Sequence, residues 1–75
     1  MNKATPIYHQ LRKLNPYLTA EQVYNLGQMV MMCVELRQET FESVMTDESL
    51  YCYGLSRKQA TIFKEYAALY KSSGS

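Results

Sequence analysis

The sequence is poor in the residues from which catalytic and metal sites are built. Its 75 residues include one histidine, His9, and two cysteines, Cys33 and Cys52. His9 has no acid beside it in the sequence and no nucleophile at a recognisable spacing, which is typical of a surface histidine. A structural zinc site takes four ligands, usually at close spacing, whereas these three candidates are scattered. The glycines stand singly and form no phosphate-binding loop. We therefore expect a protein that is not an enzyme and has no cofactor, metal or small-molecule substrate.

Long apolar runs and a disulfide framework are also missing. The longest strictly apolar run, residues 29–34, has six residues, whereas a membrane-spanning helix needs about 20. The first ten residues have one lysine and no apolar run after it, so they do not read as a secretory signal. Two cysteines without a C-x-x-C pair favour a reducing compartment. These features predict a soluble, cytoplasmic protein that does not bind membranes.

The net charge is only +1, so bulk attraction to nucleic acid or acidic lipid is weak. Its distribution along the chain is nevertheless uneven. Residues 1–20 carry three basic residues and no acid, residues 21–48 carry six acids against Arg37, and residues 55–75 carry four basic residues against Glu65. Two basic ends therefore flank an acidic middle. We interpret these charges as solvated helix faces.

Apolar residues recur at intervals of three and four along the chain, and no alternating pattern indicates a strand. We therefore predict an all-α fold, a small bundle of three to four helices. The first helix is expected over residues 6–14, with Thr5 as its N-cap and Pro6 in its first turn. The second begins after Thr19, which forms a capping box with Gln22. Gly27 weakens this helix and indicates that a neighbour approaches closely there.

The apolar spacing of the second helix continues as far as residue 45. A helix over 20–45 would be about 39 Å long, while a compact domain of this size has a radius of gyration of about 11 Å. We therefore expect either a break near residues 38–40, which is favoured for a single chain, or a helix that extends beyond the domain and pairs with another copy. Two further helices are predicted over 47–53, capped by Thr46, and over 57–70, where Ser56 and Gln59 form a second capping box. Residues 1–72 would form a single domain and residues 73–75 a frayed tail.

Residues 47–66 resemble a helix-turn-helix motif. Gly54 would be the turn, Leu55 the apolar residue after it, and Ala60 and Phe63 fall at the buried positions six and nine after the glycine. The resemblance implies that residues 56–70 are a recognition helix of a DNA-binding transcriptional regulator. Its outward residues, which would contact DNA, are Arg57, Lys58, Thr61 and Lys64, with Ser56 at the start of the helix.

Three features of the same segment differ from that motif. Leu50 occupies the position four before the glycine, where close helix crossing requires a small residue, and Ser49 occupies an apolar position. Ile62 and Tyr66 extend the apolar stripe into the face that would meet DNA. The small net charge also supplies few phosphate contacts.

The competing prediction starts from a surplus of apolar side chains. The last helix is apolar over more than one core-facing stripe, and residues 29–34 are apolar on every side. A domain this small rarely buries a helix all round, so part of this surface is expected to meet a partner. Methionine and tyrosine adapt well to such contacts. The residues predicted for the interface are Met31, Met32, Tyr51, Tyr53, Tyr66 and Tyr70.

We therefore expect a small non-enzymatic regulator or inhibitor that binds another protein or a second copy of itself. Short chains without catalytic chemistry are also found among the accessory proteins of phages and mobile elements, which is an analogy and no more. Binding to DNA through residues 56–70 is the alternative.

Overall fold

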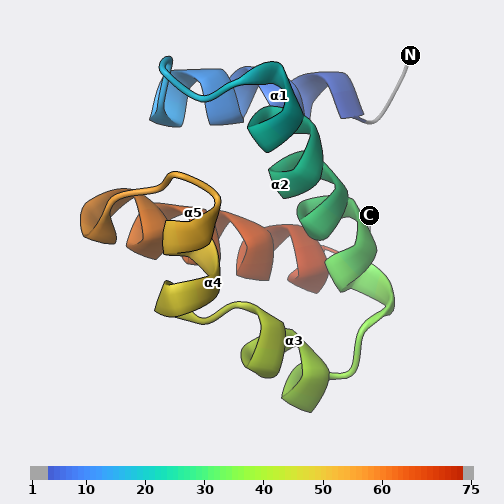
Figure 1. Ribbon diagram of the computed structural model, residues 1–75. Helices are drawn as coiled ribbons and strands as arrows, with labels where there is room; N and C mark the ends of the chain where they lie inside the picture. Colours follow the sequence, from blue (N-terminus) through green and yellow to red (C-terminus); the bar gives the residue numbers. More distant parts are fainter. Residues whose placement is uncertain (1–3, 74–75) are drawn as a thin grey trace.

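The computed structural model describes residues 4–73, and within that range the protein is all-α, as predicted, with no strand (Figure 1). These described residues form five α-helices, where three to four were expected. In chain order the elements are α1 (Ala4–Leu14), α2 (Ala20–Met32), the short 3₁₀ helix η1 (Cys33–Glu35), α3 (Gln38–Val44), α4 (Asp47–Cys52) and α5 (Arg57–Ser72).

The long second helix is broken, which accounts for the additional helix. It ends at Met32 and continues as η1, after which Leu36 and Arg37 are extended, with ψ angles of 147° and 155°. The break therefore lies just before the predicted position at 38–40. It keeps the domain compact, with a radius of gyration of 11.4 Å. Lys71 of α5 stabilises the break, because its ammonium donates to the carbonyl oxygens of Cys33, at 3.1 Å, and Leu36.

The predicted helix caps are confirmed with one exception. The side chains of Thr19 and Ser56 each accept from the backbone N–H three residues later, and Gln22 and Gln59 complete both capping boxes. Thr46 caps α4 in the same way, through the N–H of Ser49. Thr5 was wrongly predicted as a cap, because α1 begins at Ala4 and places Thr5 inside its first turn.

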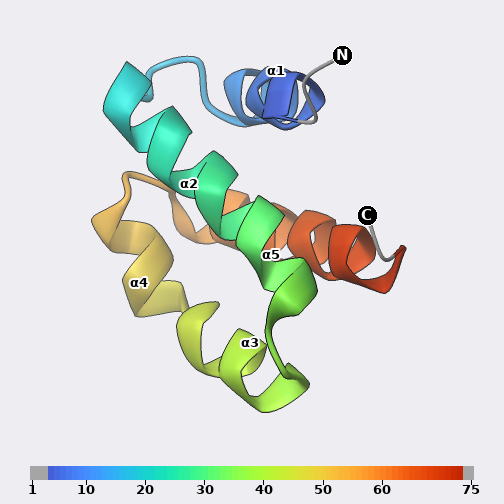
Figure 2. The same cartoon turned by 90° about the vertical axis from the view of Figure 1, so that its right-hand side faces the viewer.

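The core runs through all five helices and is thin. The structure extends 32 × 30 × 17 Å over its Cα atoms, and since a helix with side chains is about 10–12 Å across, the short dimension holds about two layers. Figures 1 and 2 show α5 lying between α1 and α3, with α2 crossing from α1 towards α3. In so thin a domain most helices keep one face in solvent. The buried apolar residues are Ile7, Leu11, Leu18, Val23, Leu26, Val30, Cys33, Phe41, Met45, Leu50, Leu55, Ala60, Phe63 and Ala67.

The close approach predicted at Gly27 is made by Tyr8 of α1. A Cβ added to Gly27 would overlap the tyrosine ring, with Cδ1 at 3.0 Å. This contact lets α1 pack against the middle of α2. The other end of α1 is joined to α5, because Gln59 donates to the carbonyl of Leu14 at 3.2 Å and accepts from the amide of Asn15 at 3.2 Å. Helix α1 is therefore fixed at both ends relative to α2 and α5.

Candidate protein-binding surface

Helix α5 has apolar side chains on two faces. Ala60, Phe63 and Ala67 point into the core and are at most 1% exposed. Ile62 and Leu69, two turns apart on a different face, are 51% and 71% exposed. The amphipathic pattern accounts for the first set, because one stripe is enough to join a helix to a core. The surplus predicted from the sequence therefore lies at the surface of α5.

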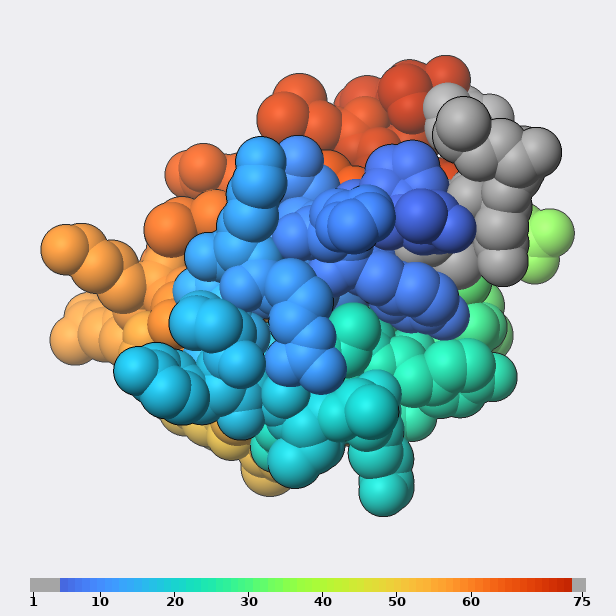
Figure 3. Space-filling model, turned by 90° about the horizontal axis from the view of Figure 1, so that it is seen from above, coloured from blue at the N-terminus to red at the C-terminus, as the bar shows by residue number. Residues whose placement is uncertain are grey.

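Ile62, at one end of this exposed stripe, also lines a groove between α1 and α5, which we call the α1/α5 groove. It has a volume of about 260 Å³. Figure 3 looks onto α1, with the atoms of α5 along one side of it. The buried side chains of Leu11 and Phe63 form part of its lining. The groove is lined by Gln10, Leu11, Lys13, Leu14, Ile62, Phe63 and Tyr66.

The phenol of Tyr66 lies in this apolar setting. Burial raises its pKa above the ordinary value of 10.0, and the neighbouring Tyr70 raises it further. A phenol is uncharged around pH 7 even at its ordinary pKa, so Tyr66 offers a partner an aromatic ring with a neutral hydroxyl. Tyrosines of this kind are frequent among the residues that contribute most to protein interfaces.

The charged side chain in the lining of the α1/α5 groove is Lys13 of α1. Lys58 lies outside the lining, exposed on α5 one turn before Ile62. The single acid of α5, Glu65, is exposed beside the same stripe. Arg12 points elsewhere, because its guanidinium donates to the carbonyl of Leu18 at 2.5 Å. The edge of the groove is therefore more basic than acidic.

The six residues predicted for the interface do not gather at this groove. Met32 and Tyr51 are exposed, at 58% and 43%. The other four, Met31, Tyr53, Tyr66 and Tyr70, are half-buried and pack against the core, and of the six only Tyr66 lines the groove.

Gln10, Lys13 and Leu14 of α1 were not predicted for the interface, because only the packing of α1 beside α5 brings them to the groove. Ile62 was expected to extend the apolar stripe of the last helix. The signal for this exposed stripe was the helical spacing of apolar residues outside the positions that face the core. Two other aromatic side chains, Tyr17 at 92% and Tyr24 at 56%, are also exposed elsewhere on the surface.

The segment that resembles a helix-turn-helix forms a turn and a helix as the motif requires. Gly54 has a φ of 92°, in the left-handed region that glycine adopts without strain. Ala60 and Phe63 are buried. Leu50 is also fully buried, at the position where the motif has a small residue.

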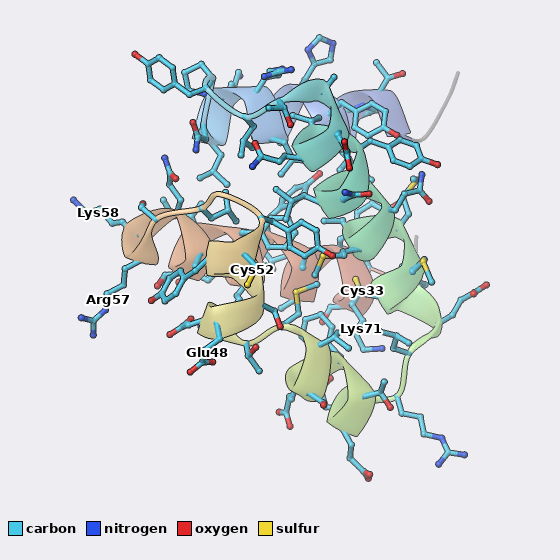
Figure 4. All side chains as sticks on the ribbon, viewed as in Figure 1. Cys33, Glu48, Cys52, Arg57, Lys58 and Lys71 are labelled. Atoms are coloured by element: carbon cyan, nitrogen blue, oxygen red, sulfur yellow. The ribbon has the colours of Figure 1, made fainter. Side chains whose placement is uncertain are left out.

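The residues proposed to contact DNA differ in their surroundings. Arg57, Lys58 and Thr61 are exposed, and Figure 4 shows Arg57 and Lys58 pointing away from the protein at the start of α5. Lys64 is half-buried and pairs with Asp47 at 2.5 Å. Of the four side chains proposed to contact DNA, Lys64 is therefore already paired with an acid of the same protein.

The residues considered for metal or redox chemistry differ in their exposure to solvent. His9 is exposed on α1, Cys33 is fully buried, and Cys52 is exposed on α4 (Figure 4). Both cysteines are free. Burial raises the pKa of the Cys33 thiol above its ordinary value of 9.0, while the nearby Lys71 partly opposes this. Among residues 4–73 no three histidine, cysteine or acidic residues lie close enough to hold a metal ion.

Helices capable of spanning a membrane are not found among residues 4–73, since each is too short or too polar. Comparison with known proteins found no match to this chain among family models, curated proteins or solved structures.

Proposed function

We propose that this protein is a small regulator or inhibitor that acts by binding another protein in the α1/α5 groove. The observation that carries the proposal is the exposure of Ile62, which lines that groove, and of Leu69, two turns further along α5. Exposed apolar patches mark interaction sites on soluble proteins. A second copy of the chain is the other occupant to be tested.

The energetics of the stripe support a binding role. Full burial of a leucine or isoleucine side chain is worth about 1.5–3 kcal/mol, so covering these two partly exposed residues contributes about 1–2 kcal/mol each. The groove adds Leu14 and Tyr66, which are half-buried in the single chain. A few such side chains around an aromatic residue are sufficient to supply most of the energy of an interface. The thinness of the domain explains why they are not covered internally.

A matched pair of double variants tests the proposal. Ile62→Glu/Leu69→Glu places two charges on the stripe, while Thr61→Glu/Ala68→Glu places them at the same spacing on exposed positions of another face of α5. All four positions are exposed, so both proteins are expected to fold, which circular dichroism checks. Proteins captured from the native host by the wild type and by Thr61→Glu/Ala68→Glu, but not by Ile62→Glu/Leu69→Glu, are identified and their binding is reconstituted with purified components.

Sedimentation of the three proteins distinguishes a partner from a second copy. A dimer that dissociates only in Ile62→Glu/Leu69→Glu would identify a second copy as the occupant. Reconstituted binding that is equally strong for both double variants would contradict the proposal.

The geometry around Gly54 favours one second candidate, a DNA-binding regulator that uses α5 as its recognition helix. The exposed Arg57, Lys58 and Thr61 at the start of α5 support it, because the N-terminal residues of such a helix contact base edges. A gel shift with duplex DNA at low and moderate salt tests it. Salt-sensitive binding that is lost in Arg57→Ala/Lys58→Ala would favour DNA, and the absence of binding by the wild type would exclude it.

A further inference from the structure

We infer that the occupant of the α1/α5 groove is an amphipathic helix of another protein with acidic residues beside its apolar face. This inference rests on the proposed function and adds the chemistry of the partner.

The spacing of the apolar residues beside the groove suits a helix. Ile62, Tyr66 and Leu69 recur at intervals of four and three residues along α5, so they form a ridge over about two turns, or roughly 10 Å. A helix offers complementary ridges and grooves at the same spacing. Leu14 of α1 and Ile62 of α5 both line the groove, so apolar side chains of a docked helix at i, i+3, i+4 and i+7 would meet apolar side chains from two helices.

The charge at the edges favours acidic residues on that helix. Helix α1 has no acid, and its Lys13 lines the groove. Lys58 lies on α5 one turn before Ile62, and both lysines are exposed. Glu65 is the only acid on either of these two helices. Acidic residues flanking the apolar face of a partner would meet these lysines at the solvated edge, where charge determines the choice of partner and the association rate.

A second copy of this chain does not offer such a helix. Its other acidic residues lie between positions 21 and 48, in α2, η1, α3 and α4. Phe41 of α3, Met45 at its end and Leu50 of α4 are buried in the core. The exposed large apolar side chains of these helices are Val44 and Tyr51, one on each helix. With seven and six residues, these helices are also too short to dock through apolar residues at i, i+3, i+4 and i+7. Symmetric pairing through the α1/α5 groove would also bring the lysines of two copies towards each other. The charges therefore favour a different protein.

A library of displayed helices tests this inference without knowledge of the natural partner. Each member has one apolar face, whose positions vary among leucine, isoleucine, methionine and phenylalanine. Four positions that flank this face carry glutamate, glutamine or lysine at equal frequency. The library is selected against the wild type, against Ile62→Glu/Leu69→Glu, and against the charge reversal Lys13→Glu/Lys58→Glu. Flanking residues are counted by sequencing before and after selection.

We expect helices selected by the wild type to be enriched in glutamate over lysine by about threefold to tenfold, since each exposed charge pair contributes modestly. The charge reversal should invert this preference, and the apolar face should still be required. Selected helices with neutral or basic flanks would overturn the inference and leave the proposed function standing. Equal enrichment on Ile62→Glu/Leu69→Glu would overturn both. If sedimentation showed that the wild type is a dimer and that Ile62→Glu/Leu69→Glu is a monomer, the occupant of the groove would be a second copy and the inference of an acidic helix would be overturned.

Discussion

Replacement of Gly27 by alanine tests the packing that places α1, and with it one wall of the α1/α5 groove. In the interior of a helix this change ordinarily stabilises by about 1 kcal/mol, because alanine has the higher helix propensity. Here the new Cβ would overlap the ring of Tyr8. Forcing extra volume into a packed contact costs about 1–3 kcal/mol. We therefore expect Gly27→Ala to lower the free energy of unfolding by between about 0 and 2 kcal/mol.

The sign of the effect should reverse when the tyrosine ring is removed. In a Tyr8→Ala background the alanine at position 27 meets no ring, so Gly27→Ala should stabilise by about 1 kcal/mol. The coupling between the two positions is then about 1–3 kcal/mol. Urea unfolding followed by circular dichroism measures all four proteins of this cycle, and an unchanged dependence on urea shows that the transitions are comparable.

A second cycle supplies the control. Tyr17 is 92% exposed in the loop between α1 and α2, so Tyr17→Ala should not couple to Gly27→Ala by more than about 0.5 kcal/mol. If Gly27→Ala stabilised the wild type by the same amount as the Tyr8→Ala protein, the inferred contact between α1 and α2 would be refuted.

Three further predictions concern the break, the turn and the buried thiol. Lys71→Met removes the ammonium that binds the carbonyls at the end of η1, so urea unfolding should show a loss of about 1–2 kcal/mol, against almost none for the exposed Lys58→Met. Gly54→Ala should cost about 1–2 kcal/mol in the same assay, because the φ of 92° is unfavourable for a residue with a Cβ. Burial raises the pKa of the Cys33 thiol above its ordinary value of 9.0. As the pH rises above about 9, this thiol loses its proton more readily in the unfolded state than in the folded state, so the free energy of unfolding falls there. Cys33→Ala should make this decline less steep, and in the wild type a thiol reagent should label Cys52 rapidly and Cys33 only on unfolding.

Each of these outcomes can fail in a specific way. Equal losses for Lys71→Met and Lys58→Met would show that the carbonyl contacts contribute nothing to stability. An alanine at position 54 without cost would contradict the left-handed turn. Equal labelling rates for the two cysteines in the folded protein would contradict the burial of Cys33, as would an unchanged alkaline decline in Cys33→Ala.

The local signals in the sequence were sufficient for most of the helix boundaries. Thr19 with Gln22 and Ser56 with Gln59 marked two helix starts, because capping depends only on residues three apart. The size of a compact domain required the second helix to break, and it does so at residues 36–37. The break was predicted slightly too late in the chain. One contact at its actual position comes from Lys71, which lies 35 residues after Leu36 and donates to its carbonyl, and no local pattern indicates such a contact.

The candidate surface was only partly visible in the sequence. The wide apolar stripe of α5 correctly indicated exposed residues such as Ile62, since one helix can direct only one face to the core. Which helix would lie beside that stripe was not predictable, because Lys13 and Leu14 reach the groove through the hydrogen bonds of Gln59 and the packing of Tyr8. These are contacts between residues far apart in the chain, and no local pattern encodes them.

The backbone amide spectrum of the labelled protein, recorded while a selected helix or the reconstituted partner is added, tests the central claim most directly. The account predicts that the shifts that change lie along residues 10–14 of α1 and 58–69 of α5, on the two sides of the α1/α5 groove. Changes centred on α3 and α4, with the amides around Ile62 and Leu69 unaffected, would contradict it.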